Sequence, residues 1–400
     1  TLPRWEELKD LSGKSVLSGV KPWLYTVRLN GTNVPPENFK LEHTSVEEGV
    51  CHLRYILTGC QGVTCEVTIT PELAFAATVR NGGVAACRAE VTGPEVGPVV
   101  LGTAADDYYV YPKEGWSFHA RPVKLAARYG GRFPLPFMGV FSASAGSGLW
   151  LSTRSTEGGM WNYGLEKRAD GTRLWLLYPE RDVPVGGTFA TAPTRLSFGG
   201  GDWHEAFDAY KAWTSSWRKP KYPRQPWFRE VFNFRQEFLH RHDPLFDPVT
   251  KTFNLRQAVA EAEEHFGGIE YLHLFDWGDV PGYGRLYGRK GDLSPYEFLG
   301  GVENFRRAIQ SVRAKGIPVG LYIEGYLVAE KGCIGQQQGK AWQIVQRNGE
   351  RMCYPGSTEM MMCPWLKAWR ETQAETYRQK VLELDVDGMY MDQFGFANPE

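Results

Sequence analysis

Short runs of alternating hydrophobic and polar residues dominate the first half of the chain. They occupy Trp23–Leu29, Cys51–Leu57, Cys65–Ile69, Ala74–Arg80 and Leu174–Tyr178. A period of two is typical of half-buried β-strands. No segment of this half carries a long apolar stripe at helical spacing. We therefore predict a large antiparallel β-sandwich over residues 1–200.

Turn signals separate these runs. Asn30-Gly31, Asn81-Gly82-Gly83 and Asp170-Gly171 are of the kind that two-residue β-hairpins favour. We expect each of them to join two neighbouring antiparallel strands.

The pattern changes at Gly199-Gly200-Gly201. Trp203, Phe207, Tyr210 and Trp213 then follow helical spacing, and Asp202 precedes them as a predicted N-cap. Three prolines within residues 220–226 stiffen the chain after this helix. We predict that residues 201–226 are a helical linker.

From residue 227 onward, predicted strands alternate with predicted helices. The strands are Glu230–Leu239, Ile269–Trp277, Ile317–Leu327 and Val386–Phe394. The helices start at an Asn254 cap, near Val302 and near Leu366. Successive β/α steps imply a parallel sheet. Because a complete eightfold barrel needs about 250 residues, we expect residues 227–400 to be the first half of a (β/α) TIM-type barrel, cut where a fifth step would begin.

Composition excludes two classes of function. The 45 Lys and Arg residues nearly balance the 46 Asp and Glu residues, which gives a net charge of −1 and argues against a nucleic-acid partner. No apolar run approaches the roughly 18–20 residues that a membrane span needs. Aromatic residues make up 14% of the chain and include 14 tryptophans, which suggests flat ligand-binding surfaces as well as core.

The seven cysteines contain no Cys-x-x-Cys pair, so a zinc ribbon or thioredoxin-like site is not expected. We predict mostly buried free thiols, with a Cys51–Cys60 disulfide as the alternative. The sequence starts at Thr1 without a basic, hydrophobic leader, which leaves the compartment open. We expect neither a cofactor nor a catalytic metal.

Polar residues stand at the ends of all four predicted parallel strands. In β/α architectures, reacting groups stand at the carboxyl ends of the strands. Carboxylates next to aromatic rings suit sugars, since acids bind or attack them and ring faces stack on their C–H side. We therefore predict a carbohydrate partner and the substrate-binding residues Asn233, Asp276, Trp277, Asp279, Glu324 and Tyr326. His273 lies inside an apolar strand, and we interpret it as a core histidine.

Three of these segments resemble the α-galactosidase (melibiase) clan of glycoside hydrolases. Gly320-Leu321-Tyr322-Ile323-Glu324 is similar to the clan's Gly-Leu-Trp-x-Glu strand, and Asp387–Asp392 is similar to the strand that ends in its nucleophilic aspartate. Phe275–Asp279 resembles, in a different order, its Asp-Asp-Gly-Trp segment that binds sugar hydroxyls. The layout of a β-supersandwich, a linking helix and a barrel is also similar, and endo-α-N-acetylgalactosaminidases and bacterial families near them share it.

This resemblance implies a retaining glycoside hydrolase that acts on an α-linked sugar, with Asp392 at the end of barrel strand 4 as the nucleophile. A retaining enzyme needs a partner acid about 5–5.5 Å from the nucleophile, and the resemblance places it after a sixth strand, beyond residue 400. Two alternatives stay open. One is an α-amylase-like glycosidase, which Asp387-Gly388-x-x-x-Asp392 also resembles. The other is a non-catalytic carbohydrate-binding or scaffold protein, in which a structural ion pair would hold Asp392.

Overall fold

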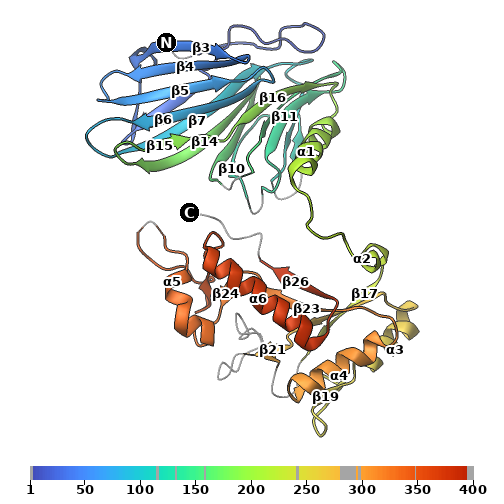
Figure 1. Ribbon diagram of the computed structural model, residues 1–400. Coiled ribbons are helices and arrows are strands. Elements are labelled where there is room, and N and C mark those ends of the chain that lie inside the picture. The colour runs from blue at the N-terminus through green and yellow to red at the C-terminus, as the bar shows by residue number, and fades with distance from the viewer. Residues whose placement is uncertain are drawn as a thin grey trace. The chain divides into compact units, whose positions relative to one another are not determined.

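The computed structural model describes residues 3–113, 117–130, 133–156, 159–239, 243–279, 294–295, 299–346 and 348–393, without the side chains of residues 117–119, 279, 294 and 295 (Figure 1). The chain divides into two compact units, Thr1–Lys219 and Pro220–Glu400. Each unit is described by itself below.

The first unit contains two antiparallel sheets. The six-stranded sheet has the order β10 (Val123–Arg128), β13 (Asn162–Arg168), β14 (Gly171–Val183), β7 (Cys87–Val99), β1 (Thr26–Leu29) and β2 (Thr32–Asn33). The ten-stranded sheet has the order β3 (Phe39–Glu47), β4 (Val50–Leu57), β5 (Val63–Ile69), β6 (Ala74–Asn81), β16 (Thr194–Gly199), β12 (Ser147–Thr153), β11 (Phe137–Ser142), β8 (Tyr108–Tyr111) and β9 (Ser117–His119), with β15 (Thr188–Ala190) beside β6. A single 3₁₀ turn, η1 (Pro36–Asn38), precedes β3.

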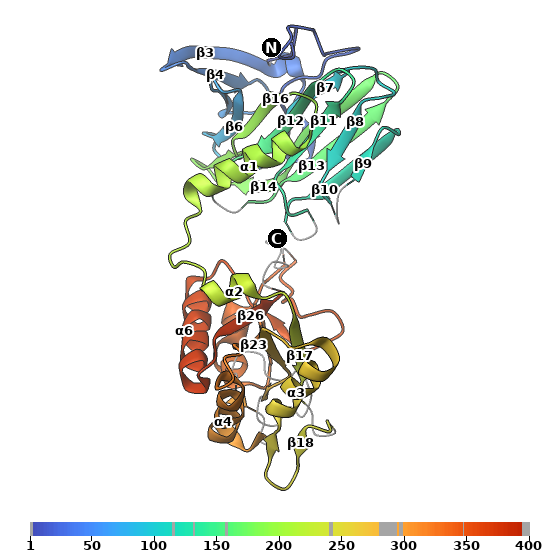
Figure 2. The same ribbon diagram turned by 90° about the vertical axis from the view of Figure 1, so that its right-hand side faces the viewer.

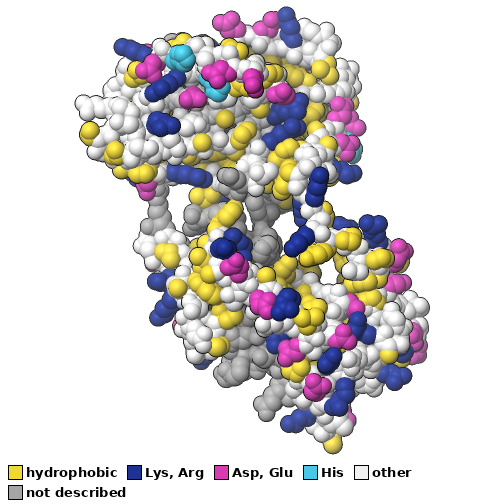
Figure 3. Space-filling view, viewed as in Figure 1, with side chains coloured by type: hydrophobic (Ala, Val, Ile, Leu, Met, Phe, Trp, Pro, Cys, Tyr) yellow, Lys and Arg dark blue, Asp and Glu magenta, His cyan; other side chains and the backbone are white. Residues whose placement is uncertain are grey.

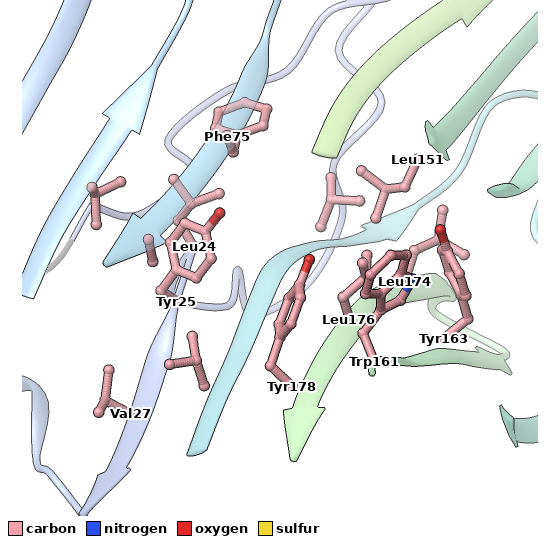
Figure 4. Close-up of a cluster of buried hydrophobic side chains, with 14 of the residues drawn as sticks. Leu24, Tyr25, Val27, Phe75, Leu151, Trp161, Tyr163, Leu174, Leu176 and Tyr178 are labelled. Carbon is pink, nitrogen blue, oxygen red and sulfur yellow. The ribbon is translucent and has the colours of Figure 1, made fainter. Parts of the chain in front are cut away.

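The two sheets share one hydrophobic core. Phe75 and Leu151 come from the ten-stranded sheet, and Tyr163, Leu176 and Tyr178 come from the six-stranded sheet (Figure 4). In strand β5 every second residue, from Val63 to Val67, is buried, as expected for a strand with one face in the core. The two antiparallel sheets and their shared core agree with the predicted sandwich.

Helix α1 (His204–Trp217) covers part of the outer face of the ten-stranded sheet. Ala206 is buried against Phe137, Phe141 and Trp150 of strands β11 and β12. This contact explains why all six residues of β11 are buried, since one face lies in the sandwich core and the other lies under the helix. The N-cap position is occupied by Trp203 rather than by the expected Asp202, although the Asp202 carboxylate accepts the His204 N–H at 3.0 Å.

The second unit is built on a four-stranded parallel sheet. Its order is β17 (Phe234–Phe238), β20 (Tyr271–Phe275), β23 (Val319–Glu324) and β26 (Gly388–Asp392). Helices α3 (Leu255–Phe266), α4 (Gly301–Arg313) and α6 (Lys367–Leu384) flank these strands (Figure 2). They share a core with Leu272, Leu274, Leu321 and Ile323, which occupy alternate positions in β20 and β23. The predicted run of β/α steps and the parallel sheet are confirmed.

The helix signals in this unit behave as the sequence predicts. The Asn254 side chain accepts the Gln257 N–H at 3.2 Å and caps α3. Gly267 ends the same helix in the left-handed conformation, at φ 75°.

Short elements complete the second unit. They are α2 (Pro226–Glu230), β18 (Phe246–Asp247), β19 (Thr252–Phe253), β21 (Gly278–Asp279), β22 (Ser294–Pro295), β24 (Leu327–Val328), the π-helix η3 (Gly335–Gly339), α5 (Lys340–Trp342) and β25 (Met360–Met361). The first predicted parallel strand, Glu230–Leu239, is thus shorter than expected and begins after α2, and Phe394, the last residue of the fourth, lies outside the described residues.

Two further findings bear on the expectations from sequence. Asn30-Gly31 and Asp170-Gly171 close hairpins, but Asn81-Gly82-Gly83 joins β6 of one sheet to β7 of the other and is not a hairpin turn. All seven cysteines are free thiols, and Cys65 and Cys87 are buried.

No helix in the described ranges is both long and apolar enough to cross a membrane. Charges of both signs are interspersed over the visible surface of each unit, in keeping with the near-zero net charge (Figure 3).

Candidate functional site

A cavity of about 900 Å³ lies on the face of the parallel sheet that the three helices leave uncovered. Side chains alternate between the two faces of a strand, so residues two apart share this face. The strand residues that line the cavity are Phe234, Gln236, Tyr271, His273, Phe275, Tyr322, Gly388, Met389, Tyr390 and Asp392, and all but Met389 follow this spacing. Trp227 and Phe228 of helix α2 complete one end.

Aromatic rings form most of the cavity floor. The Phe275 and Tyr322 ring centroids are 3.7 Å apart, and Tyr322 stacks on Tyr390 at 5.9 Å. The His273 ring meets Tyr390 edge-on at 5.7 Å. Such a floor offers flat, partly apolar surfaces with hydroxyl groups at their edges, a combination that suits a ligand with both C–H and O–H faces.

Two carboxyl groups stand at the carboxyl end of this sheet. Glu324 and Asp392 are register partners at the ends of β23 and β26. The Tyr322 hydroxyl lies between them, with Oη 2.8 Å from Glu324 Oε1 and 2.6 Å from Asp392 Oδ2. Tyr390 Oη lies 3.5 Å from the other Asp392 oxygen, Oδ1.

The two carboxyl groups affect the pKa values of the tyrosine hydroxyls around them. Burial raises the pKa of Tyr322 far above its usual range, and the contacts with Asp392 and Glu324 raise it further. The Asp392 charge is the main cause of a raised pKa at Tyr390. For Tyr326 and Tyr377, burial is the largest cause of a raised pKa, and the neighbouring Glu324 carboxyl group raises it further. These hydroxyls therefore stay protonated and can donate hydrogen bonds throughout the physiological range.

Helix α6 fixes the ends of these strands. Tyr377 Oη donates to the Glu324 carbonyl at 2.7 Å, and the Gln373 amide donates to the Gly325 carbonyl. The Gly325 N–H in turn donates to the Asp392 carbonyl at 2.8 Å. The two carboxyl groups thus stand on a backbone that is held from behind the sheet.

The backbone turns sharply where two of the strands end. Asp276 follows Phe275 with φ 54°, and Gln393 follows Asp392 with φ 56°. Few residues other than glycine adopt this left-handed conformation without cost, and it clusters at functional sites.

Asp392 is held differently from the structural carboxylate at the other end of the same strand. The Arg313 guanidinium grips Asp387 with two hydrogen bonds of 2.9 Å, and the Val319 N–H adds a third. Among the described residues, no lysine or arginine forms a salt bridge with Asp392, whose contacts are phenol hydroxyls. A carboxyl group at the wall of a cavity, in contact with phenol hydroxyls, can accept ligand hydroxyls or attack an electrophile as its carboxylate.

Three of the residues predicted to bind substrate follow strand β20. Asp276 is buried and does not line the cavity. Trp277 was expected to stack on a sugar, but it is fully buried on the opposite face of the sheet, where it stacks on Phe305 at 6.2 Å and donates its indole N–H to the Tyr322 carbonyl. Both the ring and its N–H are therefore occupied inside the protein. The side chain of Asp279 lies outside the described residues.

Two more of these residues lie away from the cavity. Asn233 precedes β17, at the amino end of the sheet, where its side chain donates to the Gly268 carbonyl at 2.7 Å. Tyr326 is buried in a small cluster with Leu327, Ile344 and Met361. Of the predicted residues, the structure brings Glu324 and Asp392 together.

The structure also brings in residues that the sequence analysis did not select. Tyr322, Tyr390 and Gln236 face the cavity, and so does His273, which is buried as expected but lies on this face with Nδ1 3.3 Å from Tyr271 Oη. Burial lowers the pKa of His273 to about 4. The period-two spacing of Tyr322 with Glu324 and of Tyr390 with Asp392 was the signal that would have found the two tyrosines.

Comparison with a family profile matches the second half of the chain. Residues 192–400 match the family described as "Domain of unknown function (DUF6259)". No curated protein matches the sequence.

Solved structures of glycoside hydrolases resemble nearly the whole chain. The α-N-acetylgalactosaminidase of Bifidobacterium bifidum, as its GalNAc complex, gives a TM-score of 0.65 at 14% identity, with 96% of this chain and 66% of that chain covered. A GH36 α-galactosidase of Geobacillus stearothermophilus gives 0.51 at 16% identity, with 96% and 54% covered. The α-galactosidase of Lactobacillus brevis gives 0.50 at 13% identity, with 96% and 52% covered.

This chain therefore spans between about half and two thirds of the length of these proteins. At such low identity the likeness concerns the fold, and it confirms the expected galactosidase-like glycoside hydrolase fold.

Proposed function

The chain belongs to the family described as "Domain of unknown function (DUF6259)", and we propose that it is part of a retaining glycoside hydrolase that cleaves an α-linked sugar from a polysaccharide or glycan. Within this proposal, Asp392 is the nucleophile, and Glu324 beside it is a substrate-binding residue. The cavity over the parallel sheet holds the sugar.

The observation that carries the proposal is the setting of Asp392. It lines the cavity at the carboxyl end of a parallel strand, next to stacked aromatic rings, and its partners are neutral phenols. In the scaffold alternative, a structural ion pair would hold Asp392. The ion pair next to this strand joins Arg313 to Asp387 instead. This contrast favours the enzyme over the non-catalytic alternative.

The proposal also concerns the fold of the second unit and the domain organisation of the chain. We infer that the parallel sheet of β17, β20, β23 and β26 is the first half of a (β/α)₈ barrel, and that residues 1–200, 201–226 and 227–400 act as sandwich, linker and barrel. The solved glycosidases of similar fold support this reading. The antiparallel sandwich that precedes the parallel sheet along the chain argues against the α-amylase-like alternative.

In the proposed reaction, an Asp392 oxygen forms a bond with the anomeric carbon while the bond from that carbon to the leaving oxygen breaks. A second carboxylic acid, about 5–5.5 Å away in retaining enzymes, gives its proton to the leaving oxygen. Water, deprotonated by the same group, then releases the sugar and regenerates the Asp392 carboxylate. Each step conserves charge and protons without a cofactor.

Aryl α-galactosides and aryl α-N-acetylgalactosaminides are the first substrates to test, because the solved proteins of similar fold are an α-galactosidase and an α-N-acetylgalactosaminidase. Activity should be measured on the complete protein, since this chain spans only part of the length of those enzymes.

The decisive variant is Asp392→Asn. It keeps the size of the side chain and removes its charge, so folding should hardly change while turnover falls by several orders of magnitude. Azide should restore turnover in Asp392→Ala, because a small anion can enter the vacated space. Asp208→Asn makes the same change at an exposed position of α1 and should leave turnover unchanged.

Wild-type rates in Asp392→Asn, on a substrate that the wild type cleaves, would show that Asp392 is not the nucleophile. Sugar binding without turnover in the wild-type protein would favour the carbohydrate-binding alternative.

A further inference from the structure

Three oxygen atoms from two neighbouring strands form a short chain at the carboxyl end of the sheet. Glu324 Oε1, Tyr322 Oη and Asp392 Oδ2 follow one another at 2.8 and 2.6 Å. Both distances are those of O–H···O hydrogen bonds, which lie between 2.5 and 3.0 Å as a rule. Each contact therefore requires a hydrogen atom.

The phenol supplies only one of these two hydrogens. A tyrosine hydroxyl has one O–H and two acceptor lone pairs, and an ionised carboxylate can only accept. If both carboxyl groups were ionised, the hydrogen could point to one of them, and the other contact would bring a negative oxygen against a phenol lone pair. A second hydrogen, on one of the carboxyl groups, satisfies both contacts.

We propose that Tyr322 is a positioning residue that makes Asp392 and Glu324 one proton-sharing unit, with two hydrogens over the three oxygens at neutral pH. One carboxyl group donates to the phenol oxygen, and the phenol donates to the other. The role given to Asp392 here rests on the proposed glycosidase function, whereas the sharing of hydrogens rests on the distances alone.

The exposures of the two groups indicate how the hydrogens are distributed. Glu324 is 8% exposed and is not among the residues that line the cavity, whereas Asp392 is partly exposed and lines it. Burial disfavours the charged form of a carboxyl group. Burial therefore favours Glu324 as the carboxyl group that carries the second hydrogen.

Four titratable groups among the described residues lie near this unit. Tyr390 of the same sheet lies beside Asp392, and His273 of β20 lies behind Tyr390. Tyr377 of α6 and Tyr326, after β23, lie near Glu324. All four are neutral at pH 7, since the phenols have raised pKa values and burial lowers the pKa of His273 to about 4.

This arrangement would leave the nucleophile with one defined attacking atom. Asp392 Oδ2 accepts the short bond from Tyr322, whereas Oδ1 has the long 3.5 Å contact with Tyr390 and is the oxygen for the anomeric carbon. When Oδ1 becomes part of an ester, Oδ2 becomes a carbonyl oxygen and can keep the same hydrogen bond. The two shared hydrogens satisfy both contacts before and after attack, so the site need not reorganise.

Infrared difference spectroscopy on the purified 400-residue chain tests the sharing without a substrate. A protonated carboxyl group absorbs at a different frequency from an ionised one. The spectrum of the wild type minus that of Glu324→Gln at pH 7 should therefore contain the absorption band of one protonated carboxyl group. The band should be lost or displaced in Tyr322→Phe, in which the phenol oxygen that accepts this hydrogen is gone. Glu95 and Glu237, whose pKa values burial raises, cancel in these differences.

Tyr111→Phe is the matched control. It removes another buried phenol, which donates to the Tyr163 carbonyl at 2.7 Å in the sandwich, and should leave the band unchanged. Absence of the band in the wild-type minus Glu324→Gln spectrum, or an identical band in Tyr322→Phe, would overturn the proposal. Should Asp392→Asn prove fully active while the band is present, the glycosidase assignment fails and the proton-sharing unit stands.

Discussion

His273 shows how burial alone fixes the state of a single residue in this site. Its imidazole is 6% exposed, between Tyr271 and Tyr390 on the cavity face of the sheet. Loss of solvation lowers its pKa from the usual 6.5 to about 4. Folding therefore requires the neutral ring, whereas the unfolded chain binds a proton below pH 6.5.

The contribution of His273 to stability therefore increases with pH. The stabilisation due to neutral His273 is fully present above pH 6.5 and is lost as the pH falls toward 4. Between pH 7.5 and pH 5 this residue should lower the free energy of unfolding by about 2 kcal/mol. Urea titrations at the two pH values should show that His273→Gln lacks this contribution, while His52→Gln, at a half-exposed site, keeps it. An equal pH dependence in wild type and His273→Gln would contradict the lowered pKa.

At the residue scale, the sequence predicts chemistry better than orientation. Asp392 and Glu324 could be selected because they end strands in which every second residue is apolar. Trp277 could not be placed, because an aromatic residue after a strand can turn toward the ligand side or toward the helices. The contact with Phe305, 28 residues away along the chain, decided this, and no local pattern reports such a contact.

At the scale of elements, one arginine ties three of them together. Arg313 at the end of α4 forms a two-pronged contact with Asp387, just before β26, and also reaches Asp385 at 2.6 Å. Asp387 accepts the Val319 N–H at the start of β23 as well. These contacts fix the amino ends of the two strands whose carboxyl ends carry Glu324 and Asp392.

Asp387→Ala should therefore destabilise the second unit. It removes both charged hydrogen bonds, leaves the half-buried Arg313 guanidinium with Asp385 alone, and leaves the Val319 N–H without its acceptor. The loss should cost about 1–3 kcal/mol of unfolding free energy. Urea unfolding followed by tryptophan fluorescence measures this. Glu375→Ala breaks an exposed contact with Arg378 on α6 and should change little. Similar effects of the two variants would show that the Arg313 contact is not structural.

Element type was predictable where the period was strong. The apolar stripe of α4 and its flanking strands follow directly from spacing, and so does the parallel direction of the sheet. Strand pairing was less predictable. Asn81-Gly82-Gly83 has the composition of a hairpin turn, yet the chain crosses here to the other sheet. The Asn81 side-chain amide donates to the Ala85 and Val183 carbonyls at this crossing. Turn residues specify a local bend, whereas the choice of partner strand depends on the whole core.

At the scale of the molecule, the first unit ends later than the sandwich pattern does. The alternating strands stop near residue 199, but the first compact unit extends to Lys219 because α1 packs on the outer face of the ten-stranded sheet. The stripe of Trp203, Phe207 and Tyr210 indicated an amphipathic helix. It could not indicate that the surface receiving this stripe is strand β11.

This contact predicts different stabilities for two fragments. Residues 1–219 should fold alone with one cooperative transition, because they contain both sheets and the helix that covers Phe137, Phe141 and Trp150. Residues 1–200 leave these side chains in water, at about 2 kcal/mol for each large side chain uncovered. Circular dichroism during urea unfolding should show a clearly lower midpoint for the shorter fragment.

A point variant tests the same contact where the shorter fragment proves insoluble. Ala206→Asp in residues 1–219 places a carboxylate among the buried apolar side chains of Phe141 and Trp150 and should lower the midpoint strongly. Lys211→Ala, on the exposed side of α1, should leave it nearly unchanged. Equal midpoints for all of these proteins would mean that the sandwich is stable without α1, and that the helix belongs with the linker between residues 201 and 226 as its sequence alone suggests.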